Sequence, residues 1–203
     1  MDDKTKIQLS PLEMDLLNNS EWILTKNGIV KKARCLLERV QENIIGYSDQ
    51  HMGIFPKEVI AISPKISKGE NYKGLPWLML DYPRYFDKEN FFAIRTMFWW
   101  GNFFSTTLHI SGKYKERCTA TIIQSYDKLS TDQVYTCINP EQWHHHLEKE
   151  NYLPVTDFSL PEFTEEVQKR SFIKLSKKIS LLQWDQAITL LTENFIKITG
   201  WLN

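Results

Sequence analysis

An arginine and a histidine lie inside the most aromatic stretch of this chain, FFAIRTMFWWGNFFSTTLHI at residues 91–110. The guanidinium of Arg95 carries a permanent charge and can hold a carboxylate or phosphate through two parallel hydrogen bonds. A histidine ring ordinarily titrates near neutral pH, so His109 is a candidate general acid or base. Because burying an unpaired charge costs several kcal/mol, Arg95 needs either a structural partner or a ligand.

Asp81 and Arg84 lie at the end of the preceding apolar run, WLMLDYPR. Asp81 is the carboxylate nearest in sequence that could pair with Arg95, and this pair is the structural interpretation. If Arg95 or Arg84 is instead unpaired, its guanidinium could hold an anionic ligand. His109 would then be the acid/base of an enzyme, with Asp81 orienting His109 or an arginine. Both interpretations stay open on the sequence.

The segment PKISKGENYKGLP, residues 64–76, is predicted to be a loop because proline and glycine punctuate it. A loop of this length inside a compact domain is often functional. Lys68 and Tyr72 in this loop are candidate ligand-binding residues. We expect the site where the loop meets the strand ends that carry the two arginines and His109.

Three consecutive histidines, His144, His145 and His146, raise the question of a metal site. The Asn-Pro pair at residues 139–140 is a typical helix start, with Asn as the cap and Pro in the first turn. Consecutive helix residues point about 100° apart, so these three rings would not converge on one ion. We therefore predict no metal site, with His144 and His145 in solvent and His146 beside an apolar face.

Composition excludes several classes of function. No phosphate-binding loop, dinucleotide-binding glycine motif or serine-hydrolase elbow occurs, and we predict no cofactor. Lys plus Arg and Asp plus Glu number 25 each, whereas nucleic-acid-binding proteins usually have a basic excess. We expect no nucleic-acid partner, a small anionic ligand as the candidate partner, and a monomer or homodimer, because zero net charge opposes association little.

The cellular setting is predicted from the N-terminus and the cysteines. MDDKTKIQLS is polar and lacks the apolar core of a signal peptide, and no run of about 18 apolar residues follows. Cys35, Cys118 and Cys137 are odd in number and widely spaced, which indicates three buried thiols in a reducing compartment. We expect a soluble cytoplasmic protein with no membrane partner.

Two helices are predicted first. Ser10-Pro11 followed by Glu13 forms a capping box, which begins the first helix. The second is expected over residues 21–45, with Gly46 just past its end. Its expected buried stripe is Ile23, Val30, Ala33, Leu37, Val40 and Ile44.

Five strand-like runs follow, at residues 59–63, 77–82, 91–100, 103–110 and 133–138. Gly101-Asn102 predicts a two-residue hairpin turn in which Trp100 faces Phe103. Because side chains alternate along a strand, that register puts Arg95 and His109 on opposite faces of the sheet.

Helices are predicted over residues 114–129, over 143–152 and from Pro161 to the end, including the basic segment 170–178. The order of helices, clustered strands and helices indicates one α+β domain over residues 1–203. Its sheet is expected to be mainly antiparallel, with four to five strands packed against helices.

Three short motifs carry a resemblance: NNSEW at residues 18–22, SKGENYK at 67–73 and LHI at 108–110. In this order they resemble a family of uncharacterised bacterial proteins of similar length. The resemblance implies an α+β bacterial cytoplasmic protein. It implies no chemistry, because that family has no assigned function.

The leading functional hypothesis is a non-catalytic domain that binds a small molecule or a protein. The alternative is an enzyme acting on an anionic substrate, with His109 as acid/base and Arg84 and Arg95 holding the anion. A third hypothesis is a structural subunit of a larger assembly, joined through the aromatic hairpin edge or the C-terminal helix.

Overall fold

The computed structural model describes residues 7–202. The chain forms two compact units, one ending at Cys35 and the other beginning at Leu36. The first contains α1 (Pro11–Asn18) and the beginning of α2 (Ser20–Gln50), and the second contains the rest of α2 and every strand.

Both N-terminal helices are where the sequence predicts them. The capping box is confirmed, since Oγ of Ser10 accepts from the Glu13 amide and the Glu13 carboxylate accepts from the Ser10 amide. The predicted end of α2 is wrong, because the helix continues through Gly46 to Gln50. The predicted stripe is buried at Ala33, Leu37, Val40 and Ile44, but Ile23 is 42% exposed.

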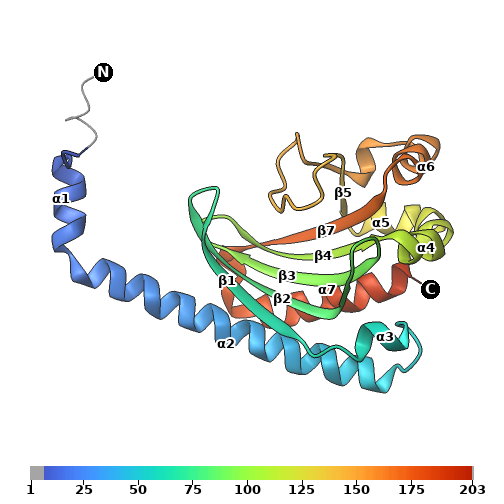
Figure 1. Ribbon diagram of the computed structural model, residues 1–203, viewed down its shortest axis with the longest axis horizontal. Helices are drawn as coiled ribbons and strands as arrows, with labels where there is room; N and C mark the ends of the chain where they lie inside the picture. The colour runs from blue at the N-terminus through green and yellow to red at the C-terminus, as the bar shows by residue number, and fades with distance from the viewer. Residues whose placement is uncertain (1–6, 203) are drawn as a thin grey trace. The chain divides into compact units, whose positions relative to one another are not determined.

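An antiparallel sheet forms the centre of the second unit (Figure 1). Its strand order is β1-β2-β3-β4-β7-β5-β6. The bounds are β1 (Lys65–Tyr72), β2 (Leu75–Phe86), β3 (Phe91–Trp99), β4 (Phe103–Ser111), β5 (Tyr135–Cys137), β6 (Tyr152–Pro154) and β7 (Phe172–Ser180). The predicted α+β class is confirmed, although the described residues form seven strands rather than four to five.

Helices cover one face of this sheet (Figure 1). The remaining helices are α3 (Lys57–Ile60), α4 (Gly112–Gln124), α5 (Tyr126–Thr131), α6 (Leu160–Lys169) and α7 (Ala187–Trp201). α7 lies against β4 and β7. The second half of α2 joins α7 where the Tyr47 and Phe195 rings meet edge to face at 6.2 Å, and where the Tyr47 and Thr199 hydroxyls bond at 3.2 Å.

Three predicted elements are of the wrong type. Residues 65–72 form β1 rather than a loop, because their backbone pairs with β2. Residues 172–180 form β7 rather than a helix, because Ile173, Leu175 and Ile179 alternate with polar residues and face the core. Residues 57–60 form the short helix α3 where a strand was expected, and Val59 N bonds back to Pro56 O at 3.0 Å.

The predicted helix over residues 143–152 is also absent, and the chain from 139 to 151 is irregular. Asn139 accepts from the Glu141 amide at 2.8 Å, as in an Asx turn, rather than capping a helix. Further along, main-chain groups bond to side chains from distant strands, including Tyr72 and Lys174. These long-range bonds replace the helical ladder.

The hairpin between β3 and β4 has a three-residue connection, and this changes the register by one. Asn102 N bonds to Trp99 O at 3.1 Å, and Gly101 adopts φ +70° between them, as a type II turn requires. Trp99 therefore pairs with Phe103, rather than Trp100. The prediction that Arg95 and His109 lie on opposite faces is wrong: a one-residue shift moves His109 to the face of Arg95.

Substitution of Gly46 tests whether α2 continues past this residue. Its φ is not positive, and an added Cβ would meet no atom within 4 Å. We predict that Gly46→Ala raises the free energy of unfolding by about 0.5–1 kcal/mol, because alanine favours a helix interior. Urea titration measures this, with Gly101→Ala as the control that should destabilise. A loss of stability in Gly46→Ala would mean that the helix ends at Gly46.

Candidate functional site

Polar side chains cross the sheet face that the irregular segment 139–151 covers. Asp81 on β2 pairs with Arg95 on β3. Arg95 pairs in turn with Thr107 on β4, and Thr107 pairs with Ser176 on β7. Directly opposite residues of an antiparallel pair share a face, so these four form one polar row. We call this the polar face. The other face, with Leu78, Phe98, Phe104 and Ile179 in one row, is apolar.

Arg95 pairs with Asp81, as the structural interpretation expects. Nε of Arg95 donates to Oδ1 of Asp81 at 2.8 Å, and Nη2 donates to Oδ2 at 3.4 Å. The pair is well buried, with side-chain exposures of 14% for Arg95 and 8% for Asp81. Nη1 of Arg95 is buried and has no acceptor among the described residues. The guanidinium is therefore only partly satisfied.

Lys174 is the second cation of the polar face, and it is 1% exposed. Its Nζ donates to the main-chain oxygens of Gln142 at 2.8 Å and His144 at 2.5 Å. It also lies 5.5 Å from the centre of the Tyr152 ring. Burial lowers the pKa of Lys174 to about 7. Lys174 thus fastens the irregular segment to β7.

His109 is on β4, the strand between those that carry Arg95 and Lys174, and it is completely buried. Its Nε2 is 3.3 Å from Oε1 of Gln142, which can only accept, so the proton is assigned to Nε2. Nδ1 has no partner among the described residues. Burial lowers the pKa of His109 well below its ordinary value, and the charges of Lys174 and Arg95 lower it further. His109 is therefore neutral at pH 7.

Tyr72 organises the histidine triplet. Its hydroxyl accepts from the amides of His145 at 2.6 Å and His146 at 3.2 Å, so its own proton is left for Nδ1 of His146 at 2.8 Å. The neutral His146 ring then carries its proton on Nε2, 3.4 Å from Oε1 of Glu150. His146 is buried, but its ring nitrogens meet Tyr72 and Glu150. His144 and His145 are half-buried rather than solvated.

His146, Glu148 and Glu150 form the one cluster of the described chain with metal-ligand spacing, their ligand atoms lying within 4.8 Å. The Lys73 ammonium already occupies it, 2.6 Å from Glu148 and 3.9 Å from Glu150. A metal would have to displace this ammonium and the Nε2 proton of His146. The cluster is accounted for as an ion-pair network.

A hollow of about 240 Å³ opens beside Arg95. We call it the Arg95 hollow. Its walls are largely aromatic and thioether groups, and its lining is Asn71, Tyr72, Trp77, Met79, Arg95, Met97, Trp143 and His145. The Trp143 ring centre is 5.9 Å from the guanidinium carbon, and Trp143 is 46% exposed. The hollow can accept a small planar ligand next to the Arg95 guanidinium.

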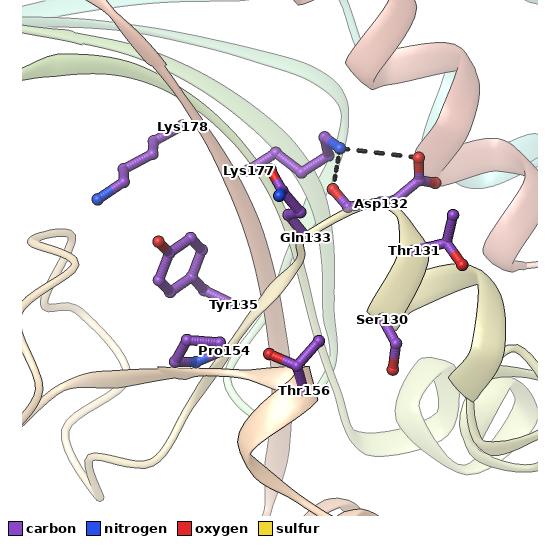
Figure 2. Close-up of a pocket in the computed structure, with 9 residues that line it drawn as sticks. All are labelled: Ser130, Thr131, Asp132, Gln133, Tyr135, Pro154, Thr156, Lys177 and Lys178. Carbon is purple, nitrogen blue, oxygen red and sulfur yellow. Dashed lines mark hydrogen bonds and ion pairs between the residues drawn. The ribbon is translucent and has the colours of Figure 1, made fainter.

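A larger polar cleft of about 500 Å³ is lined by residues of α5, β5, β6 and β7, among others (Figure 2). In Figure 2, Lys177 turns toward Asp132 and donates to its main-chain oxygen. Lys197 lies 2.5 Å from the Asp132 carboxylate, and the Lys178 ammonium lies 5.1 Å from the Tyr135 ring. Lys177 is held by Asp132, and Lys178 is exposed, so neither lysine that lines this cleft is buried without a partner, and we take the Arg95 hollow as the candidate site.

The structure brings together only some of the predicted site residues. Tyr72 and Arg95 line the hollow, and Asp81 supports Arg95. His109 shares the polar face but does not line the hollow. Lys68 is exposed and pairs with Leu78, on the other face of the sheet. Arg84 donates from Nε to Ser63 O at 2.8 Å, at the approach to β1.

Sequence reasoning missed Lys174, Trp143 and the lining role of His145. All three lie in segments that the sequence predicts to be helical and that the structure shows as irregular chain or as β7. The period-two alternation of residues 172–180 was the available signal for Lys174, since it puts this lysine on the face opposite Ile173 and Leu175.

Comparison of the chain with protein-family models, curated proteins and solved structures finds no match. The resemblance carried by the three short motifs therefore stays a prediction. Within the described residues, no helix combines the length and the apolarity that crossing a bilayer requires.

Removing one partner tests the buried ion pair. We predict that Arg95→Met lowers the free energy of unfolding by about 3–5 kcal/mol, because it leaves Asp81 buried and unpaired. The double variant Arg95→Met/Asp81→Leu should recover most of this loss. Arg84→Met is the matched control and should lose about 1 kcal/mol, for one hydrogen bond. A fully stable Arg95→Met protein would exclude a structural pair.

The buried ammonium predicts a pH dependence. The pKa of Lys174 is about 7 in the folded chain and higher when unfolded, so the unfolded state binds more protons above pH 7 and stability rises with pH. Between pH 7 and 8.5 the Lys174 contribution should be about 1–2 kcal/mol. Urea unfolding at both pH values should show this rise in the wild type and in Lys178→Met, and a smaller rise in Lys174→Met. An equal rise in all three would contradict it.

Proposed function

We propose that this chain is a non-catalytic binding domain that holds a small, flat carboxylate in the Arg95 hollow. The observation that carries the proposal is the buried Nη1 of Arg95, which has no acceptor among the described residues. An unsatisfied charged donor is costly, and a carboxylate oxygen would satisfy it. The half-exposed Trp143 ring lies against this guanidinium, and its movement would admit the ligand.

The sign of the local potential supports an anion. Asp81 neutralises Arg95, but Lys174 adds a second cation to the same face. Burial is the main cause of the lowered pKa values of His109 and of His145, which lines the hollow, and the charges of Lys174 and Arg95 lower both pKa values further. A positive potential that disfavours imidazolium favours a carboxylate at the same place.

The size and lining of the hollow support a small aromatic or heteroaromatic ligand. At about 240 Å³ it lies below the range for drug-sized ligands, about 300–1,000 Å³. Trp77, Trp143 and Tyr72 offer ring faces and edges, and two methionines offer soft, adaptable contacts.

The enzyme alternative is supported less well. It needs His109 to exchange a proton with a substrate in an open cleft. His109 is completely buried, does not line the hollow and has aromatic neighbours, including Phe91 at 4.5 Å and Trp143 at 5.4 Å between ring centres. Asp81 is engaged by Arg95 rather than by His109.

We further propose a bacterial cytoplasmic setting, as the motif resemblance implies. The absence of any disulfide among the described cysteines supports a reducing compartment. The expectation of three buried thiols needs correction, because Cys35 is exposed and only Cys137 is fully buried.

Binding of simple probes tests the proposed function. We predict that benzoate or indole-3-carboxylate quenches or shifts the tryptophan fluorescence with a dissociation constant of about 0.1–1 mM. Arg95→Lys should weaken binding at least about tenfold, because lysine keeps the charge but loses the planar fork. Arg84→Lys, the same substitution outside the hollow, should have no effect.

The neutral analogue benzamide completes this experiment. It should bind wild type and Arg95→Lys equally weakly, because it brings no charge to the guanidinium. Equal affinity of wild type and a folded Arg95→Lys variant for benzoate, or no saturable binding of either carboxylate, would overturn the proposal.

A further inference from the structure

The N-terminal unit exposes most of its large apolar side chains. We call residues 7–35 the arm. Its exposed fractions are 83% for Ile7, 68% for Leu12, 71% for Leu17, 52% for Trp22 and 65% for Leu24. These residues lie close together in sequence: Ile7 precedes α1, and the others are on α1 and the first turns of α2. A concentration of apolar surface of this kind marks an interaction site.

Apart from its capping box, the helix α1 has little of its own to keep it folded. It is eight residues long and buries none of them. Isolated helices shorter than about 12–15 residues are marginal in water, and helices in proteins depend mainly on packing. Half of its residues are apolar, and they point to more than one side of the helix, as in helices that are covered by other chains.

The charges of the arm are divided by sign. Residues 11–21 contain Glu13, Asp15 and Glu21 and no Lys or Arg. Residues 25–35 contain Lys26, Lys31, Lys32 and Arg34 and no Asp or Glu. The apolar triplet Trp22-Ile23-Leu24 separates the two stretches.

We propose that the arm is the interface of a two-fold symmetric homodimer, in which residues 11–21 of one copy lie along residues 25–35 of the partner copy. A two-fold axis near the triplet Trp22-Ile23-Leu24 sets each acidic stretch against a basic one, twice, so the surface is self-complementary. The exposed apolar side chains offer an area on the order of the 800 Å² per partner that standard interfaces bury. This partner is a second copy of the chain, whatever the Arg95 hollow binds.

Sedimentation of the full chain tests the apolar contacts of the proposed dimer interface. The wild type should sediment as a dimer at about 100 µM and dissociate on dilution. Leu17→Asp/Leu24→Asp should be a monomer. Leu182→Asp is the control, because Leu182 is 97% exposed outside the arm, and this variant should remain a dimer. A wild type that is monomeric at this concentration overturns the proposal.

Charge reversal tests the orientation of the two arms in the dimer. Asp15→Lys/Glu21→Lys makes both stretches basic, and Lys31→Glu/Lys32→Glu makes both acidic, so each variant alone should dimerise at least about tenfold more weakly. An equimolar mixture should restore a dimer containing one copy of each. These variants leave the Ser10–Glu13 capping box intact.

Two outcomes would contradict the antiparallel dimer. One is a mixture no more associated than its components. The other is a monomeric wild type that sediments with phosphatidylcholine–phosphatidylserine vesicles and loses this binding in Leu17→Asp/Leu24→Asp, which would assign the arm to a membrane surface.

Discussion

A buried ammonium group fixes the surface on which the rest of the site depends. Lys174 on β7 donates to the main-chain oxygens of Gln142 and His144, and so holds an irregular segment against the sheet. The same segment supplies Trp143 and His145 to the wall of the Arg95 hollow and Gln142 to His109. Desolvation of this ammonium costs stability, as its pKa of about 7 indicates. This cost in stability accompanies the bonds that hold the irregular segment over the polar face.

The two cations of the polar face have different consequences. Lys174 is satisfied by carbonyls, and its role is to hold the covering segment. Arg95 keeps one nitrogen that finds no acceptor in the described part of the chain, even though it is paired with Asp81. Buried polar groups without partners are uncommon in folded proteins and occur at sites that take a ligand or a water. Together with the aromatic walls of the hollow, this favours binding over proton-transfer chemistry, for which the neutral, enclosed His109 is poorly suited.

The sequence predicts the class of fold and offers Asp81 as one candidate partner of Arg95, but it does not predict the register of the central hairpin. The capping box of α1 and the apolar stripe of α2 are local signals; the box is confirmed, and the stripe is confirmed from Ala33 to Ile44 but not at Ile23. The turn at Gly101 takes three residues rather than two, and the difference reverses one strand's faces. Asn139-Pro140 has the local features of a helix start, yet the bonds from Lys174 and Tyr72 determine the path of the chain there. Those partners lie far away in sequence, so no local pattern could indicate them.

The measurement that tests the central claim most directly is a titration of ¹⁵N-labelled protein with benzoate, following the Arg95 side-chain and Trp143 indole resonances by NMR. A ligand held in the Arg95 hollow should shift both resonances along one saturable curve, while the Arg84 side chain stays unchanged. Shifts spread over exposed lysines without saturation, or a saturable response that leaves Arg95 and Trp143 unmoved, would contradict the assignment of this hollow as the binding site.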